Sequence, residues 1–561
     1  MGSEAPRRLP RRALTLGLLV TMLLPLTVRS QEAPGSYDAL VTLFAQWRAF
    51  EKPPLRDGAP DYGATAMAAQ HEGLRSLQAR LRAIDPSGWP IPQQVEYHLV
   101  RAEMNGLDFN HRVLRPWARD PAFYLSVWSE QSDTPAHEGP THHAAIDLWT
   151  YTFPLTAADE AKLAAELRTI PLLLRQARQN LTGNARELWL TGIGTMRGQV
   201  AALEDLQRRT ACAGKAFTGA TAAALRSTQD FVAWLEEQAP SKTGPSGIGK
   251  ENYNWALRNV HLIPMTWDDE VRLLRRELDR AHASLHLEEQ RNRNLPSLTA
   301  IATPEEYARR ANEAVTKYLA FLKRNEIMPI RGSMDPALRA HLGAFVPLES
   351  RNFFQIVTHY EPMALYTHFY HWWDIARMRE EPNPSPVRRG PLLYNIFAGR
   401  SEGLATGVEE MMMHAGLYDD NPRVREIVWI MLAQRAARGL GSLYVHANDF
   451  TLQQARDFHV EWTPRGWMRK DLDLLGFEQQ LYLRQPGYGS SYITGKYQIE
   501  RLLAERSHQL GDMFKLADFF AEVDAAGVIP VSLIRWQLTG KDDEIRALLA
   551  DGGTLSCRLR P

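Results

Sequence analysis

Helical periodicity is the feature that most constrains this fold. After residue 36, apolar residues recur at three- and four-residue spacing through nearly every segment, which is the period of an amphipathic helix. The clearest runs are EGLRSLQARLRAI (72–84), ADEAKLAAELRTIPLLLRQARQNL (158–181), DDEVRLLRRELDRAHASLHLEEQRN (268–292) and PEEYARRANEAVTKYLAFLKRN (304–325). Alternating, strand-like runs are scarce. We therefore predict an all-α protein in which helices pack on helices.

Helix start signals support this prediction. Thr303 precedes Pro304 and two glutamates, so it is expected to cap a helix whose first residue is the proline. Thr156 stands in the same way before a run of helix formers that begins at Ala157.

The domain organisation is less sharply marked. The Pro-, Gly- and Ser-rich segment SKTGPSGIGKENYNW (241–255) is the best internal boundary. We predict an N-terminal helical half at 31–245 and a C-terminal half at 246–561, with one continuous domain as the alternative.

The first thirty residues differ from all that follow. Four arginines precede an apolar run from Ala13 to Val28, and small residues stand before Gln31. This pattern predicts a signal peptide at 1–30 and an exported protein, periplasmic or extracellular. The apolar run includes Pro25 and is shorter than the roughly 20 residues of a spanning helix, so no membrane association is expected once it is removed.

Charge and cysteine content exclude some classes of function. The formal net charge is zero, and no Lys/Arg run follows the N-terminal segment, which argues against a nucleic-acid partner. Cys212 and Cys557 are the two cysteines. They are expected either to form a disulfide or to remain two separate thiols. Because two cysteines cannot build a thiolate zinc site, any metal must be held by histidine and carboxylate side chains.

The stretch HYEPMALYTHFYHWWDIAR (359–377) places histidines and an aspartate among large aromatic residues. His368, His371 and Asp374 follow one another at three-residue spacing, and on a continuous helix they would share one broad face. Imidazole and carboxylate ligands suit zinc, iron or manganese. The alternative is a set of core histidines, with Trp372 and Trp373 as core or pocket lining.

A second segment, AGRSEGLATGVEEMMMHAGLYDDNP (398–422), could complete such a site. Glu402 and Glu409 are two helical turns apart on one face, and their neighbours are largely apolar. An inward carboxylate opposite a histidine-bearing helix is one way to build a helical metal centre; the alternative is a solvated acidic face. The motif HEGPTHH (137–143) lies in a Pro/Gly-rich segment and is interpreted as a loop.

Ordered blocks of the C-terminal half resemble a known family. YEPMALYTH (360–368), SEGLATGVEE (401–410), RAARGLGSLYVHANDFTLQQA (435–455) and RQPGYGSSYITGKYQIERL (484–502) are similar to segments of the bacterial family called domain of unknown function 885. Members of this family are helical, frequently secreted and similar to zinc peptidases. The resemblance implies a large multi-helical body with a central cleft, like that of helical zincin-like peptidases.

The resemblance also suggests metal ligands. His368 and Glu402 occupy two ligand positions, and Asp374 stands where the family has a second histidine, so these three are the expected ligands. Phe369 replaces the glutamate that would accept a proton, and phenylalanine cannot do so. His371 or Glu409 would have to act as the base instead.

Other residues match substrate-binding positions of the family. His446 and Tyr492 would hydrogen-bond a developing oxyanion, and Arg438 would bind a carboxylate end of the substrate. Trp372 and Trp373 carry no such match, and as large aromatic residues beside His371 they are expected to line the pocket or the core.

Three functions remain open from the sequence. The first is an exported metal-dependent hydrolase that uses zinc, or alternatively iron or manganese, on a small-molecule or peptide-like ligand in a helical cleft. The second is a pseudoenzyme or binding protein that keeps the cleft without metal. The third is a metalloenzyme whose reaction is not hydrolysis.

Overall fold

A computed structural model describes residues 35–550 of the chain. The predicted signal peptide at 1–30 lies outside the described residues, as does Cys557, so the predicted disulfide alternative is not tested. Cys212 is exposed at the surface.

The described chain is almost entirely helical, as predicted. The helices of its first part are α1 (Tyr37–Phe50), α2 (Ala64–Arg82), α3 (Ile91–Phe109), α4 (Pro116–Arg119), α5 (Ala157–Leu167), α6 (Thr169–Asn180), α7 (Arg186–Arg209) and α8 (Lys215–Gln238). The later helices are α9 (Lys250–Asn259), α10 (Trp267–Arg291), α11 (Pro304–Arg324), α12 (Met334–Arg339), α13 (Phe353–Tyr360), α14 (Pro362–Tyr366), α15 (Tyr370–Glu380), α16 (Ala398–His414), α17 (Val424–His446), α18 (Leu452–Trp462), α19 (Asp473–Arg484), α20 (Tyr488–Leu510), α21 (Leu516–Ala526), α22 (Val531–Thr539) and α23 (Asp543–Ala550).

Within residues 35–550, β structure is confined to two short pairs. Strands β1 (Leu55–Arg56) and β2 (Ala59–Pro60) are antiparallel, and β3 (Val127–Trp128) pairs in parallel with β4 (Ile146–Asp147). Among the described helices, none is long and apolar enough to cross a bilayer.

The predicted helix starts are confirmed at both threonines. The Thr303 side chain accepts a hydrogen bond from the Glu306 amide at the start of α11, and Thr156 does the same from the Asp159 amide at the start of α5. Each cap satisfies an N–H group that a helix end leaves without an intrahelical partner.

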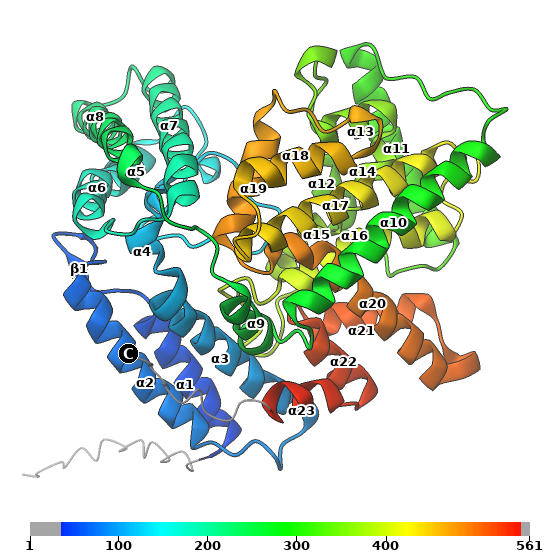
Figure 1. The fold of residues 1–561 in the computed structure, drawn as a ribbon, viewed down its shortest axis with the longest axis horizontal. Coiled ribbons are helices and arrows are strands. Elements are labelled where there is room, and N and C mark those ends of the chain that lie inside the picture. Colours follow the sequence, from blue (N-terminus) through cyan, green and yellow to red (C-terminus); the bar gives the residue numbers. More distant parts are fainter. Residues whose placement is uncertain (1–34, 551–561) are drawn as a thin grey trace, which may run out of the picture.

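Two hydrophobic cores lie side by side in the molecule. Helices α5–α8 surround the smaller core, at the upper left of Figure 1. Helices α1–α3 share the larger core with the later helices, although they belong to the predicted N-terminal half. The domain boundary at residue 245 stays a prediction.

Three helices, α16, α17 and α20, form the centre of the larger core. Almost every residue of α17 is buried, which is typical of a helix in the middle of a large protein. Helices α16 and α20 cross at glycines: a Cβ atom on Gly403 would lie 2.2 Å from the carbonyl carbon of Gly495, and one on Gly495 would lie 2.0 Å from the Gly399 oxygen. Because side chains are absent there, the two backbones touch, and Glu402 is held beside the start of α20.

Candidate metal centre

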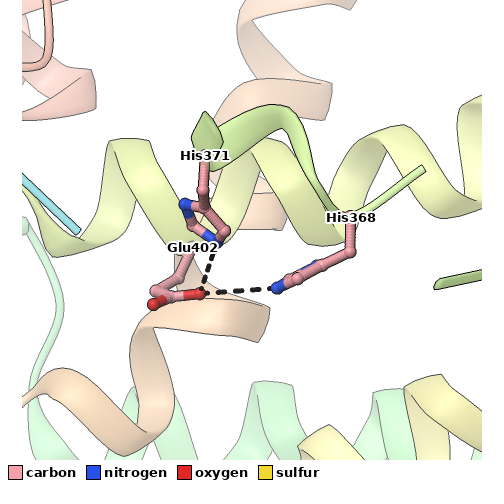
Figure 2. A group of neighbouring side chains, drawn as sticks. All are labelled: His368, His371 and Glu402. Atoms are coloured by element: carbon pink, nitrogen blue, oxygen red, sulfur yellow. Dashed lines mark hydrogen bonds and ion pairs between the residues drawn. The ribbon is translucent and has the colours of Figure 1, made fainter. Parts of the chain in front are cut away.

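Two histidines and a glutamate converge in the larger core. His368 lies in the turn before α15, His371 in the first turn of that helix, and Glu402 in the first half of α16. Figure 2 shows both imidazole rings pointing at the same carboxylate. One ligand atom from each residue lies within 4.8 Å of the other two, and all three side chains are buried.

The spacing of these atoms fits a tetrahedral ion. The Nε2 atoms of His371 and His368 lie 3.1 and 3.7 Å from Glu402 Oε2. Ligands about 2.0–2.1 Å from a tetrahedral zinc ion are about 3.3–3.4 Å apart, and the two distances fall on either side of that value. We call His368, His371 and Glu402 the histidine–glutamate cluster.

Electrostatics in the cluster favour a cation. Burial lowers the pKa of His371, but the Glu402 carboxylate more than offsets this and raises that pKa to about 9. Burial raises the pKa of Glu402, while His371 and His368 lower it well below its usual value. The cluster thus holds a buried carboxylate that is stabilised by positive charge beside it.

Polar groups also face the outer side of each ring. His371 Nδ1 lies 3.1 Å from Ser401 Oγ. His368 Nδ1 lies 2.9 Å from Glu409 Oε1, off the direction of a good hydrogen bond. Groups in these places orient a metal-binding histidine and fix which nitrogen faces the ion. Glu409 also accepts a 2.5 Å hydrogen bond from fully buried Arg435.

Asp374 does not join the cluster, contrary to our expectation, and His371 takes the place that we assigned to it. The Asp374 carboxylate instead pairs with Arg400 at 2.9 Å and with Arg377 at 3.0 Å. Burial raises the pKa of Asp374, but these two guanidinium groups lower it further. Helix α15 begins only at Tyr370, so the continuous helical frame that we assumed for all three residues does not hold.

Phe369 and the two tryptophans pack against other elements. Phe369 stacks on Tyr366, Trp372 stacks on His341 at 3.4 Å, and Trp373 stacks on Tyr318 while its indole N–H donates to the Met334 carbonyl. The two tryptophans therefore face α11 and α12, and Phe369 faces α14.

The remaining predicted residues differ in how they lie relative to the histidine–glutamate cluster. The Tyr492 ring lies parallel to the His368 ring, 6.2 Å away, and Arg438 lies over Tyr492 while it pairs with Glu478. His446 instead bonds to the Tyr482 carbonyl at 2.9 Å, and burial lowers its pKa to about 4.

The sequence analysis missed Tyr488, the first residue of α20. Its hydroxyl donates a 2.5 Å hydrogen bond to Glu402 Oε1, the carboxylate oxygen that does not face the histidines. This contact fixes the rotation of the carboxylate. Tyr488 stands within the family-like block at 484–502, but nothing local distinguishes it from Tyr492.

The sequence analysis also missed two acidic residues of the loop at 129–145, which joins β3 to β4. Asp133 interacts electrostatically with His371, Glu402 and His368, although more than 230 residues separate them in the chain. Burial raises the pKa of Asp133. Burial and then Asp133 raise the pKa of Glu138 to about 8.

A cavity of about 600 Å³ borders the same loop. Ser132 and Thr134 line it from the loop, and Tyr394, Asn395 and Arg484 line it from the later part of the chain. The cavity therefore lies where the N-terminal helices meet the larger body, and its lining does not include His368, His371 or Glu402.

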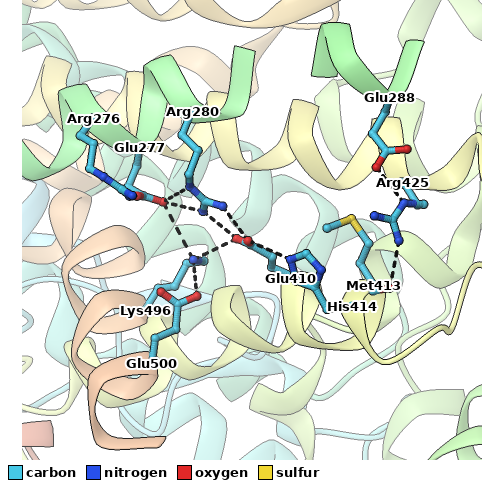
Figure 3. A network of polar contacts seen from close by, with 10 residues as sticks. All are labelled: Arg276, Glu277, Arg280, Glu288, Glu410, Met413, His414, Arg425, Lys496 and Glu500. Carbon is cyan, nitrogen blue, oxygen red and sulfur yellow. Dashed lines mark hydrogen bonds and ion pairs between the residues drawn. The ribbon is translucent and has the colours of Figure 1, made fainter. Parts of the chain in front are cut away.

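A second polar cluster shares helix α16. Arg280 of α10 forms a two-pronged ion pair with Glu410, at 2.7 and 2.8 Å, and Lys496 of α20 lies 2.9 Å from the same carboxylate. Glu277 pairs with Arg280, and Glu500 pairs with Lys496 (Figure 3). We call these five residues the α16 salt-bridge network.

Comparison with solved structures shows two similar folds. A protein from Shewanella oneidensis, described as a lipoprotein of unknown function, has a TM-score of 0.67 and 15% identity, over 90% of this chain and 100% of its own. A second, described as a lipoprotein from Colwellia psychrerythraea, has a TM-score of 0.63 and 14% identity, over 90% of this chain and 99% of its own. At these identities the likeness concerns the fold alone.

Comparison of the sequence with curated proteins finds no match. A comparison with protein families finds one that covers more than half of the chain, at residues 48–332 and 371–538. The matched residues include His371, Glu402 and the loop that carries Asp133. The chain therefore belongs to the DUF885 family, which is described as a bacterial protein of unknown function.

Proposed function

We propose that this protein is a metal-dependent hydrolase whose ion is held by His368, His371 and Glu402. The observation that carries the proposal is the convergence of two imidazole nitrogens and one carboxylate oxygen at buried positions. Two histidines and a glutamate form the ligand set of several zinc hydrolases, in which a fourth position stays open for water or substrate.

The residues around the cluster support this assignment. Ser401 and Glu409 face the outer nitrogens of the two histidines, and Tyr488 fixes the carboxylate. A divalent ion bound here would supply Lewis-acid chemistry, because it polarises a carbonyl oxygen and makes water a nucleophile near neutral pH. The protein's own side chains would hold the ligands rigid and orient the substrate.

The cavity supplies a place for a substrate. It is large enough for a small molecule or a short peptide segment, and Arg484, which lines it, is paired with Asp120. We infer that the substrate is an amide or ester of this size, in keeping with the family's similarity to zinc peptidases. We also infer that the chain is exported through its N-terminal thirty residues and acts without nucleic acid.

One observation favours a second candidate function. Two histidines with one carboxylate also form the triad that holds iron(II) in non-haem oxygenases, and Phe369 removes the glutamate base that hydrolysis would use at that place. A non-hydrolytic iron enzyme is therefore the alternative, and the identity of the bound metal separates the two.

The test is metal analysis of the purified protein. We expect about one zinc ion per wild-type chain, and almost none in His368→Ala or His371→Ala. His414→Ala is the matched control, because this histidine lies on α16, the helix that carries Glu402, but contacts Glu410 rather than the cluster. Iron in place of zinc would favour the second candidate, and equal, near-zero metal in all four proteins would overturn both.

Hydrolysis is tested separately on a defined mixture of peptides, with mass spectrometry of the products. We expect cleavage by the zinc-loaded wild type that is lost on chelation and in His371→Ala. Cleavage that persists in His371→Ala would contradict a role for the cluster.

A further inference from the structure

The cavity of about 600 Å³ has charged groups in its lining that the metal centre does not use. Two of them are carboxylates, Glu51 and Asp147, and two are guanidinium groups, Arg48 and Arg484. A pocket of this kind selects its ligand through a small number of polar groups set among apolar ones. The partners of these four residues therefore decide which ligand charge the cavity fits.

Both guanidinium groups are matched by carboxylates that do not line the cavity. Arg48 lies 3.3 Å from Glu103, whose side chain is fully buried. Arg484 pairs with Asp120 at 2.6 Å. Neither Glu103 nor Asp120 belongs to the lining, so the positive charge of the lining is already balanced from outside the cavity.

The two carboxylates of the lining have no such partners. Glu51 Oε1 lies 3.0 Å from His143 Nε2 and accepts a 3.2 Å hydrogen bond from the Tyr394 hydroxyl. Asp147 Oδ1 lies 2.7 Å from His137 Nε2. Among residues 35–550, neither carboxylate has a lysine or arginine within ion-pair distance. A neutral imidazole and a phenol can donate all of these bonds, so no permanent positive charge balances the two carboxylates.

Glu51 is the more enclosed of the two carboxylates. Its side chain is 11% exposed, against 38% for Asp147. Its second oxygen, Oε2, has no hydrogen-bond partner in the described part of the chain and yet is not sealed from solvent. Enclosed charges are normally paired, and an accessible carboxylate oxygen in such a place is a binding position for a cation.

The loop at 129–145 forms one wall of the cavity and supplies no cation to it. Ser132, Thr134, His137 and His143 are among the loop residues of the lining. No lysine or arginine stands in the chain between Arg119 and Lys162. This wall therefore lacks the groups that bind a carboxylate or phosphate ligand.

Aromatic rings stand close to Glu51. The Tyr394 hydroxyl bonds to it, and the Tyr62 hydroxyl accepts a 2.9 Å hydrogen bond from the backbone amide of His143, the residue whose ring meets Glu51. Aromatic rings attract cations through their faces. The apolar part of the lining includes Leu107, Phe109, Trp117 and Phe123. These surroundings fit a positively charged amino group that is attached to an apolar group.

We propose that this cavity binds its ligand through a free amino group, with the Glu51 carboxylate as the partner of the ammonium ion. The aromatic and apolar lining receives the group that carries the amine. The inference rests on the proposed function only in taking the ligand to be the substrate, which is then an amide or ester with a free amino group. Binding in the cavity itself requires no metal ion.

The test is isothermal titration with three probes of similar size and different charge. Phenylbutylamine is positive at neutral pH, phenylbutanol is neutral and phenylbutyrate is negative. We expect the wild type to bind the amine at least about tenfold more tightly than the alcohol, because the ammonium ion forms a charge-assisted hydrogen bond and interacts with aromatic rings. Phenylbutyrate should bind most weakly. None of the probes has an amide or ester bond, so the titrations can be made with and without a zinc chelator, and the two sets of affinities should agree.

Glu51→Gln removes the charge and keeps an oxygen that Tyr394 and His143 can bond. We expect it to weaken amine binding about tenfold and to leave phenylbutanol binding unchanged, which also shows that the cavity is intact. Asp147→Asn, at a more exposed place, should weaken amine binding less. Glu72→Gln is the control and should change neither affinity, because the Glu72 side chain is 77% exposed and lies outside the lining.

Several results would overturn the inference. They are equal binding of the amine and the alcohol, tighter binding of phenylbutyrate, and no binding of the amine to the wild type. Unchanged amine affinity in Glu51→Gln would also contradict it, or in Asp147→Asn if the first variant does not fold. The metal analysis is independent of this outcome. Amine binding by a protein without metal would leave the inference intact and remove the proposed function, and a zinc-bound protein that does not distinguish the probes would do the reverse.

Discussion

Helix α16 carries two buried polar clusters that differ in how completely they are satisfied. In the α16 salt-bridge network, Arg280, Lys496 and Glu410 all find partners of opposite charge (Figure 3). In the histidine–glutamate cluster, His368 Nδ1 lacks a well-aligned hydrogen bond, and beside the cluster Arg435, which pairs with Glu409, leaves two buried nitrogens without hydrogen-bond partners. One carboxylate of each cluster, Glu402 or Glu410, lies on this single helix of seventeen residues.

The difference separates a structural role from a binding role. A complete ion-pair network leaves no vacant bonding positions for a ligand, and its effect is to tie α10, α16 and α20 together. Buried polar atoms without partners are costly in a folded protein, and they are commonly found where a ligand or ion completes the set. Four substitutions test whether the two clusters have different roles.

Glu402→Gln and Glu410→Gln form a matched pair on the same helix. We expect Glu402→Gln to weaken zinc binding more than about a hundredfold, since it removes a ligand rather than a group that supports one. Glu410→Gln should leave zinc binding unchanged and lower the free energy of unfolding by about 3 kcal/mol, because it leaves Arg280 and Lys496 short of a partner. Competition with a zinc chelator and urea denaturation measure the two effects. Equal loss of zinc binding in both variants would contradict the assignment of a binding role to one cluster and a structural role to the other.

Asp374→Asn tests the residue that we first expected to be a ligand. It removes the shared partner of Arg377 and Arg400 in a buried place, so we expect a loss of about 3 kcal/mol or more of stability. Zinc affinity, measured at a temperature where the variant is folded, should stay within about threefold of wild type. Loss of a group that hydrogen-bonds to a ligand would weaken it by at least about tenfold. A large loss of zinc from a folded variant would restore Asp374 to the ligand set.

Glu409→Gln probes the support of the cluster. Glu409 faces the outer nitrogen of His368 and pairs with Arg435, so its neutralisation should weaken zinc binding by about 10- to 100-fold. Isothermal titration with zinc would show this change. If affinity fell as far as in Glu402→Gln, Glu409 would be acting as a ligand.

The smallest effect is a dependence of stability on pH. Burial raises the pKa of Glu410, but Arg280 and the neighbouring cations lower it below its usual value near 4.5. The unfolded chain therefore takes up a proton at Glu410 before the folded chain does, so the stability that this group contributes is complete above about pH 5 and is lost as the pH falls below that value. Urea midpoints at pH 7, 5 and 4 should fall less steeply in Glu410→Gln than in the wild type. If the urea midpoints of the wild type and of Glu410→Gln fell equally, Glu410 would make no contribution to the pH dependence of stability.

The sequence predicted most of the fold and part of the site. Periodicity and N-caps such as Thr303 are local signals, and they predicted the helices well. His368 and Glu402 were correctly expected to lie together, because the segments that carry them occur in the same order as the corresponding family motifs. The partnership of Asp374 with Arg400 was not predictable, because no local pattern shows which of two nearby groups a buried carboxylate will face. Asp133 was out of reach for the same reason, since its neighbours are defined only by how distant segments pack.

The backbone contact at Gly403 and Gly495 has a consequence for the order in which the protein matures. His368, His371 and Glu402 come together only after α16 has packed on α20 and the turn before α15 has packed on both. A partly folded chain therefore presents these three side chains to an ion separately. Metal uptake should therefore follow the last step of folding. If the chain leaves the cell unfolded and binds an ion at this cluster as proposed, the ions available outside the cytoplasm would decide which metal it carries.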